Sequence, residues 1–315
     1  MRRYIFLLIM LLPVVSCSQM IVPEPAGADR ILCLNARLYT ADTLHTVSAC
    51  YGCRTGVEPA PGTVVVCFVN GVRVDEAVAD SLGDAQLRAR IEPGDTVCVT
   101  ADAPLAPSVS AKTVAPLPPV IGHAGIGLIE GYQQVRLQVA DNSPEEDYFV
   151  VKLYEDNVVY NQDGGEVVLQ ERSPSLVRGE QGRVFSDHAF AGAAQTMNIV
   201  VDGTTRYQYM YRWYGSYDYG HEVPEKQRFA LETSMRLRLC SLCAGDYWTS
   251  FLLSGDSWDG FENPLDQIGG AMVYPCNVDG GAGLVAVRSC AEVVLPYAEV
   301  IMDGSGRILS DRYLF

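Results

Sequence analysis

The sequence predicts an all-β protein with two parts, an N-terminal immunoglobulin-like sandwich followed by a larger antiparallel β-sandwich domain. Three observations support this fold class. Apolar and polar residues alternate with a period of two in short runs, as they do in strands that bury one face. Clusters of Gly, Pro, Asn and Asp separate these runs about every ten residues, as turns do. Helical periodicity is almost absent.

The N-terminal domain is predicted over residues 30–116. Thr63–Asn70 (TVVVCFVN) is a β-branched, apolar run, and Asn70-Gly71 at its end is a strong hairpin signal. Ala85–Ile91 alternates cleanly, with its apolar side chains on one face and Gln and Arg on the other. A turn containing Pro and Gly then leads into another strand, Thr96–Ala101. These strands indicate one small antiparallel sandwich.

Three prolines in four residues, Pro116, Pro118 and Pro119, mark the predicted domain boundary. Proline removes ladder donors and favours an extended, stiff connector. We therefore assign residues 117–124 to a linker and residues 125–315 to the C-terminal domain.

The C-terminal domain shows the same strand pattern. Val135–Ala140 alternates, Asp141–Asp147 predicts a turn, and Tyr148–Tyr154 is expected to return as the partner strand. Met235–Leu239 places Met, Leu and Leu inward and two arginines outward. A short helix is expected at Asp246–Leu253, where the strand pattern lapses. This density of half-buried strands favours a sandwich or barrel over a doubly wound sheet.

The N-terminus has the form of a secretory signal, predicted over residues 1–16. Arg2 and Arg3 precede an apolar stretch that is too short to span a membrane, and Cys17 directly follows Ser16. This arrangement resembles a lipobox, in which Cys17 is the lipid-attachment residue. Ordinary signal cleavage beside a chance cysteine is the alternative. Residues 17–29 then form a lipidated tether.

The net charge of the chain restricts the classes of partner that it can bind. The formal net charge is −15, and loss of Arg2 and Arg3 with the signal makes it more negative. Such an acidic protein is a poor binder of nucleic acid or anionic lipid headgroups. We therefore expect membrane contact through the N-terminal lipid anchor and no nucleic-acid partner.

Ten cysteines are present, and nine remain once Cys17 is assigned to the lipid. An odd number cannot pair completely within one chain, although the cell envelope permits disulfides. One or two disulfides are expected, with their connectivity left open. Cys67 and Cys98 lie in apolar strands, which favours small core residues.

Two cysteine pairs have C-x-x-C spacing. Cys50 and Cys53 suit a small disulfide or half of a metal site, and their strand-like neighbours disfavour a redox motif. Cys240 and Cys243 continue a strand, in which positions three apart point to opposite faces. Structural thiols are the favoured interpretation of both pairs.

No motif supports catalysis. Gly255-Asp256-Ser257 lacks the glycines of a serine-protease loop and a suitably placed His. Asp187-His188 is expected to be a solvated or turn-capping pair. The acidic loop 256–266 lacks the register of a calcium loop. Asn277–Gly283 is glycine-rich, which we interpret as close backbone packing or a bulge. We expect neither an enzyme nor a bound metal or cofactor.

The segment 207–219 (YQYMYRWYGSYDY) is the most informative surface candidate. It holds six tyrosines and one tryptophan, and in a strand four of its aromatic residues share one face. Such a row either stacks on a partner or forms the sandwich core. The candidate partner-binding residues are Tyr207, Tyr209, Tyr211, Trp213, Tyr217 and Tyr219.

Several segments together resemble a family of Bacteroidetes envelope lipoproteins known as domain-of-unknown-function family 4249. The resemblance covers most of the chain after the signal. The segments are Pro61–Val66, Pro93–Val97, Val135–Tyr154, Arg183–Gly192, Phe261–Pro264 and Cys276–Gly283.

The resemblance implies an outer-membrane lipoprotein with an N-terminal immunoglobulin-like domain, often encoded beside TonB-dependent transporters. It brings no catalytic residues. The leading hypothesis is a binding or accessory component of a TonB-dependent transport system. The alternatives are an adhesive or structural surface module and, third, a hydrolase or metalloenzyme. The sequence leaves open whether the protein lies on the periplasmic face of the outer membrane or on the cell surface.

Overall fold

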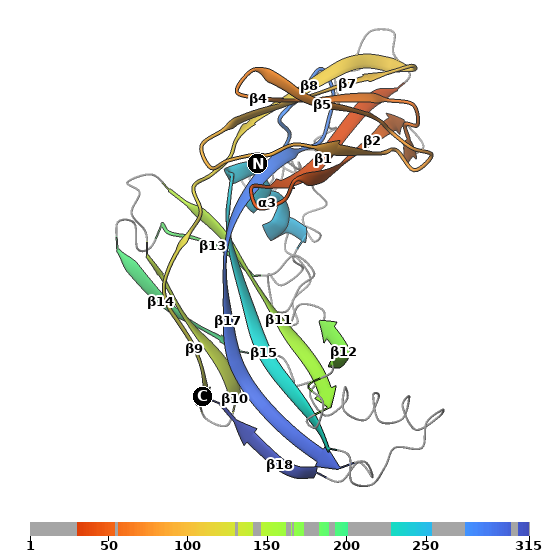
Figure 1. Cartoon of the computed structure of the whole chain (residues 1–315). Coiled ribbons are helices and arrows are strands. Elements are labelled where there is room, and N and C mark those ends of the chain that lie inside the picture. The colour runs from red at the N-terminus through yellow and green to blue at the C-terminus, as the bar shows by residue number, and fades with distance from the viewer. Residues whose placement is uncertain are drawn as a thin grey trace, which may run out of the picture.

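The protein is all-β, as the sequence predicts, and strands dominate the part of the chain that the computed structural model describes (Figure 1). The described residues are 30–53, 56–129, 132–140, 146–161, 165, 167–172, 183–188, 193–200, 228–253, 275–303 and 308–314.

Two facing sheets form the first sandwich. One sheet contains the order β17-β1-β2-β3, with β6 also paired to β2. The other has the order β16-β8-β7-β4-β5. The strands are β1 (Ile31–Tyr39), β2 (Leu44–Cys53), β3 (Gly56–Pro59), β4 (Val64–Val69), β5 (Val72–Val78), β6 (Asp84–Arg88), β7 (Thr96–Ala103), β8 (Ala106–Val114), β16 (Val278–Asp279) and β17 (Val285–Asp303).

The period-two pattern explains the core between these sheets. Every second residue of β1 and β7 is buried, so that Leu32 and Leu34 meet Val97 and Val99 in one cluster. Each such burial stabilises the fold by about 1.5–3 kcal/mol. The turn after β4 is formed by Asn70-Gly71, both with positive φ (52° and 79°), which confirms the hairpin prediction.

The second sandwich packs a three-stranded sheet, β14-β10-β9, against the long strands β11, β15 and β17. In the long sheet β15 lies along one edge of β11, β12 and β13 pair with two successive parts of its other edge, and β18 pairs with β17. The remaining elements are β9 (Val120–Ile129), β10 (Tyr132–Ala140), β11 (Tyr148–Asn161), β12 (Val167–Arg172), β13 (Arg183–Ser186), β14 (Ala194–Val200), β15 (Arg228–Leu242), α3 (Ala244–Leu253) and β18 (Ile308–Tyr313).

One predicted pairing is wrong. Tyr148–Tyr154 does not pair with Val135–Ala140, because β11 joins β12, β13 and β15 whereas β10 joins β9 and β14. The two strands instead lie in opposite sheets, and Val135, Leu137 and Val139 face the same core as Phe149 and Val151. Alternation specifies a buried face equally well for a neighbour within one sheet and for a strand across the core.

The first sandwich also includes strands from near the C-terminus. β16 pairs with β8, and residues 285–288 of β17 run parallel to residues 36–39 of β1 before β17 continues antiparallel to β15. β17 is thus one strand shared by both sandwiches, visible as the long curved ribbon in Figure 1. The division of the chain at residues 116–125 stays a prediction, with β9 beginning at Val120, inside the predicted linker.

The glycine-rich segment 277–283 lies directly against β1. Gly281 and Gly283 would each place an added Cβ 2.3 Å from a backbone carbonyl oxygen, that of Leu32 and that of Leu34 respectively. Only glycine therefore permits this approach. The interpretation of the segment as close backbone packing is confirmed.

Candidate functional site

The candidate site is the junction of the two sandwiches, where α3 follows β15, packs on β11 and β13, and is bonded to β17 through Asp246. The helix begins directly after β15 ends, and its residues divide into two faces. Asp246 and Ser250, one turn apart, are buried. Trp248 and Phe251 lie on the other side with exposed fractions of 49% and 39%.

A buried ion pair joins α3 to β17. Arg288 Nε donates to Asp246 Oδ2 at 2.5 Å, and Arg288 Nη2 donates to Asp246 Oδ1 at 2.8 Å. The same Nη2 donates to Ser250 Oγ at 3.0 Å. The exposed fractions of the Arg288 and Asp246 side chains are 1% and 0%. The bidentate geometry of the pair and the third hydrogen bond, to Ser250, offset the free-energy cost of burying both charges.

The same carboxylate also holds β1. Arg37 Nε donates to Asp246 Oδ1 at 3.2 Å, so that Asp246 is shared by arginines from β1 and β17. Burial opposes ionisation of Asp246, but the hydrogen bonds and charges of Arg288 and Arg37 outweigh it and lower the pKa of this carboxyl. Asp246 therefore stays charged and ties the two sandwiches together.

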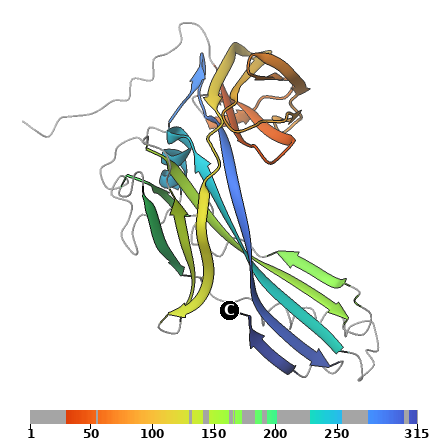
Figure 2. The ribbon, with the colours of Figure 1, turned by 60° about the vertical axis from the view of Figure 1, so that its left-hand side comes forward.

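A second contact fixes the path of the chain between the sandwiches. Ser289 Oγ donates to the carbonyl oxygen of Pro116 at 2.5 Å, which ties the proline connector to β17. Figure 2 shows the two segments passing from one sandwich to the other. Both crossings are thus held in place, since β17 is itself a continuous strand there.

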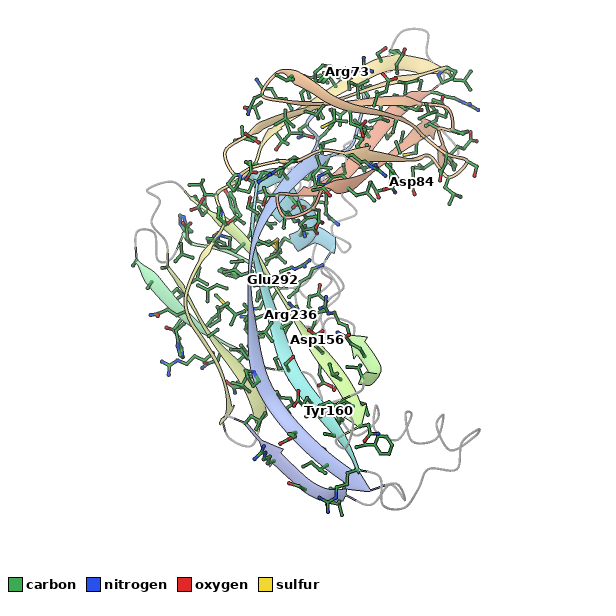
Figure 3. All side chains as sticks on the ribbon, in the orientation of Figure 1. Arg73, Asp84, Asp156, Tyr160, Arg236 and Glu292 are labelled. Atoms are coloured by element: carbon green, nitrogen blue, oxygen red, sulfur yellow. A yellow bond between two sulfur atoms is a disulfide. The ribbon has the colours of Figure 1, made fainter. Side chains whose placement is uncertain are left out.

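The outer face of the long sheet carries a row of charges below this junction. Asp156 accepts from Arg236 Nε at 2.8 Å and from Arg172 Nε at 2.6 Å. Glu292 accepts from Arg236 Nη1 at 3.1 Å and also pairs with Arg238. In Figure 3, Glu292, Arg236, Asp156 and Tyr160 follow one another down this face.

Positive charge exceeds negative charge over this part of the face. Lys152 of β11 lies directly opposite Arg238 of β15, and two like charges in this cross-strand position repel each other. Burial, followed by the charges of Arg288, Arg37 and Arg238, lowers the pKa of Lys152. Four cations, Lys152, Arg172, Arg236 and Arg238, meet the two carboxylates Asp156 and Glu292 here, and further along the face Glu232 accepts a hydrogen bond from the Tyr160 hydroxyl at 2.6 Å.

A disulfide lies beneath the helix. Cys240 and Cys290 are directly opposite each other on β15 and β17 and are bonded, with their Cα atoms 3.9 Å apart. They pack in a small apolar cluster with Val150, Leu242 and Tyr247. The bond cross-links the two longest strands at the end where α3 begins.

The structure settles several of the sequence predictions. The helix at Asp246–Leu253 is confirmed. Cys240 pairs with Cys290 and not with Cys243, as expected for positions three apart in a strand. Asp187 is buried and accepts a hydrogen bond from the Asp147 amide at 3.0 Å, which fits the capping interpretation. The neighbouring His188 is exposed.

Other predictions fall on residues outside the described part of the chain. They are the lipid-attachment residue, the acidic loop 256–266 and the aromatic candidates, and they stay predictions. The residues concerned are Cys17, Tyr207, Tyr209, Tyr211, Trp213, Tyr217 and Tyr219.

Sequence reasoning missed the charged centre of the junction. Arg288 directly follows the apolar run Val285–Val287, and an arginine in a buried strand of this kind signals an ion pair. The sequence offers no comparable sign for its partner, because Asp246 lies 42 positions away at the start of a helix.

No helix in the described ranges reaches the length and apolarity of a membrane span. Over those same ranges, no three His, Cys, Asp or Glu side chains are grouped as metal ligands.

Comparisons with known proteins give no family. No family model and no curated protein matches the chain. A solved BSP domain of a biofilm-associated protein aligns with a TM-score of 0.22 and 12% identity, covering 64% of this chain and 27% of that one. A Bacteroides uniformis β-glucuronidase aligns at 0.13 and 11%, covering 66% and 22%. The chain thus spans about a quarter of these proteins, and TM-scores this low establish no shared function.

Proposed function

We propose that the protein is a lipid-anchored module of the outer membrane that binds another protein without catalysing a reaction. Its partner is a component of a TonB-dependent transport system. The lipid anchor at Cys17 and the resemblance to envelope lipoproteins support the location and the partner. The described fold supports a role in holding a binding surface in a fixed position.

The observation that carries this proposal is the shared strand β17. A single strand belongs to both sandwiches, and Asp246 ties α3 to β1 and β17 at the point where they join. Bending the molecule there would break a buried ion pair. The loss of one partner from such a pair costs about 3–5 kcal/mol. Rigid elements of this kind keep a binding face in a defined orientation and lower the entropy lost on binding.

The charged face of β11, β15 and β17 is the proposed contact. Its excess of positive charge stands out on a chain with a formal net charge of −15. Such a face attracts an acidic surface and disfavours contact with the same, like-charged face of a second copy. The partner therefore presents carboxylates to Lys152 and Arg238.

Co-purification from mild detergent tests the proposal. The tagged, lipidated chain is extracted from membranes of its native cell, and a transporter is expected to elute with it. Lys152→Glu is expected to reduce the recovered transporter at least tenfold, and added salt is expected to weaken the complex. The matched control is Arg90→Glu, which changes an exposed residue of the first sandwich. Elution of the lipoprotein alone, in low salt, would overturn the proposal.

The second candidate function is a surface adhesive module. The concentration of aromatic residues in segment 207–219 favours it, because Tyr and Trp are suited to stacking on sugars or protein. This alternative predicts binding to glycans or matrix that falls when Tyr217 and Tyr219 become Ala. The binding would be independent of any transporter and unaffected by Lys152→Glu.

A further inference from the structure

Two cysteines face each other on the outer side of the first sandwich. Cys33 on β1 stands directly opposite Cys50 on β2 in the antiparallel register. The residues flanking them, Leu32, Leu34 and Ala49, are buried in the core, so both cysteines lie on the opposite face of the sheet. Both are partly exposed.

The backbone places these two residues within reach of a disulfide. The amide of Leu34 and the carbonyl of Leu32 bond to Ala282, on the other side of β1. The amide and carbonyl of Cys33 therefore point toward β2, which makes Cys33 and Cys50 a hydrogen-bonded pair. Such pairs have Cα atoms about 5.5 Å apart, inside the range of roughly 4.4–6.8 Å that disulfides bridge.

The two thiols differ in acidity. The Cys50 thiol donates a hydrogen bond to the Cys33 sulfur, and this bond, helped by the backbone at Gly52, outweighs burial and lowers the pKa of Cys33 to about 7. The same bond, together with burial, raises the pKa of Cys50. A thiol whose pKa lies near the ambient pH is the best attacking group in thiol–disulfide exchange.

We infer that Cys33 and Cys50 form a thiol–disulfide exchange site on the first sandwich, with Cys33 as the attacking thiolate and Cys50 as the resolving thiol. The site reacts stoichiometrically with a reactive disulfide, carried by an envelope dithiol oxidoreductase or by a small molecule such as oxidised glutathione. The junction disulfide Cys240–Cys290 shows that directly opposed cysteines of this chain are bridged elsewhere in the fold.

The exchange balances without any further reactant. The Cys33 thiolate attacks one sulfur of the donor disulfide, forms a mixed disulfide and expels the other sulfur as a thiolate. Cys50 then loses its proton and attacks the Cys33 sulfur, which releases the second donor thiolate. Two protein thiols become one disulfide, and the donor disulfide becomes two thiols.

Mapping the products by mass spectrometry tests this site. The folded chain is incubated with oxidised glutathione near pH 7, blocked with an alkylating agent and digested without reduction. Peptides linking Cys33 to Cys50 are expected to appear and to be lost again on treatment with reduced glutathione in large excess. In Cys50→Ser the glutathione adduct is expected to remain on Cys33.

Controls separate this reaction from general thiol oxidation. Cys98, a partly exposed thiol of β7, is expected to remain a free thiol during the incubation and therefore to be recovered alkylated, without glutathione. In Cys33→Ser, Cys50 is expected to take up glutathione at least tenfold more slowly than Cys33 does in Cys50→Ser. Alkylation of both Cys33 and Cys50 after incubation, or a link from Cys50 to another cysteine, would overturn the inference.

Discussion

Arg288 of β17 and Asp246 of α3 are 42 positions apart, yet they form a two-point ion pair with almost no exposure to solvent. A second arginine, Arg37 of β1, reaches the same carboxylate. Three elements from different parts of the sequence thus meet on one side chain.

Asp246→Ala is expected to destabilise the protein strongly, because it leaves the buried charge of Arg288 without its carboxylate. Breaking a buried pair in this way costs about 3–5 kcal/mol of the free energy of unfolding. Urea denaturation measures the effect. Glu92→Ala, which breaks the exposed pair with Arg90, is the matched control and should cost less than about 1 kcal/mol. Equal losses in the two variants would contradict the proposed role of the junction.

The same carboxylate predicts a loss of stability in acid. Its pKa is lower in the folded chain than its ordinary value, about 3.9, so its contribution is fully present above that value. The contribution falls as the pH drops through the folded pKa. Denaturation midpoints measured from about pH 6 to pH 2 should therefore fall less steeply for Asp246→Asn than for the unmodified chain. Parallel curves would show that Asp246 is not responsible.

Gly281→Ala is expected to separate the C-terminal segment from the first sandwich. The added Cβ would lie 2.3 Å from the Leu32 carbonyl oxygen and 2.7 Å from Val109 Cγ1, so the backbone must move. Overpacking of this kind costs about 2 kcal/mol or more, measured by thermal unfolding. Gly127→Ala is the control, since an added Cβ there meets nothing within 4 Å. A Gly281→Ala protein as stable as that control would contradict the close approach.

Removal of the disulfide is expected to weaken the second sandwich. The bond between Cys240 and Cys290 closes a loop with a sequence separation of 50, which in the chain-entropy model stabilises the folded state by about 4 kcal/mol. Cys240→Ser combined with Cys290→Ser should lower the urea midpoint accordingly. Cys98→Ser, a change to an unbonded and partly exposed thiol, should leave it nearly unchanged. Equal midpoints for the two proteins would refute the stabilising role.

The acidity of Cys33 predicts an unusual pH profile. Because its pKa is about 7, its rate of alkylation should rise roughly tenfold between about pH 6 and pH 8 and then level off. Cys50→Ala removes the hydrogen-bond donor and should move this profile to higher pH, whereas Cys50→Ser keeps a donor and should move it less. Rates are followed by mass spectrometry of the Cys33 peptide. A profile that is unaffected by Cys50→Ala would exclude the shared hydrogen bond.

The sequence determined which segments are strands and which side of each is buried. Met235, Leu237 and Leu239 are fully buried between outward-facing arginines, as their alternation predicts. The hairpin at Asn70-Gly71 and the helix at α3 were also predictable. Each of these features depends on neighbouring residues alone, through side-chain period, turn conformation and helix propensity.

Only the tertiary structure decided which strands pair. It placed residues 148–154 across the core from residues 135–140, added 278–288 to the first sandwich, and brought Cys33 to Cys50 and Arg288 to Asp246. Alternation shows that a strand has a buried face, but every strand edge presents the same amide and carbonyl groups to its neighbours. Choice of partner therefore depends on packing over the whole core, and the candidate sites depend on that choice.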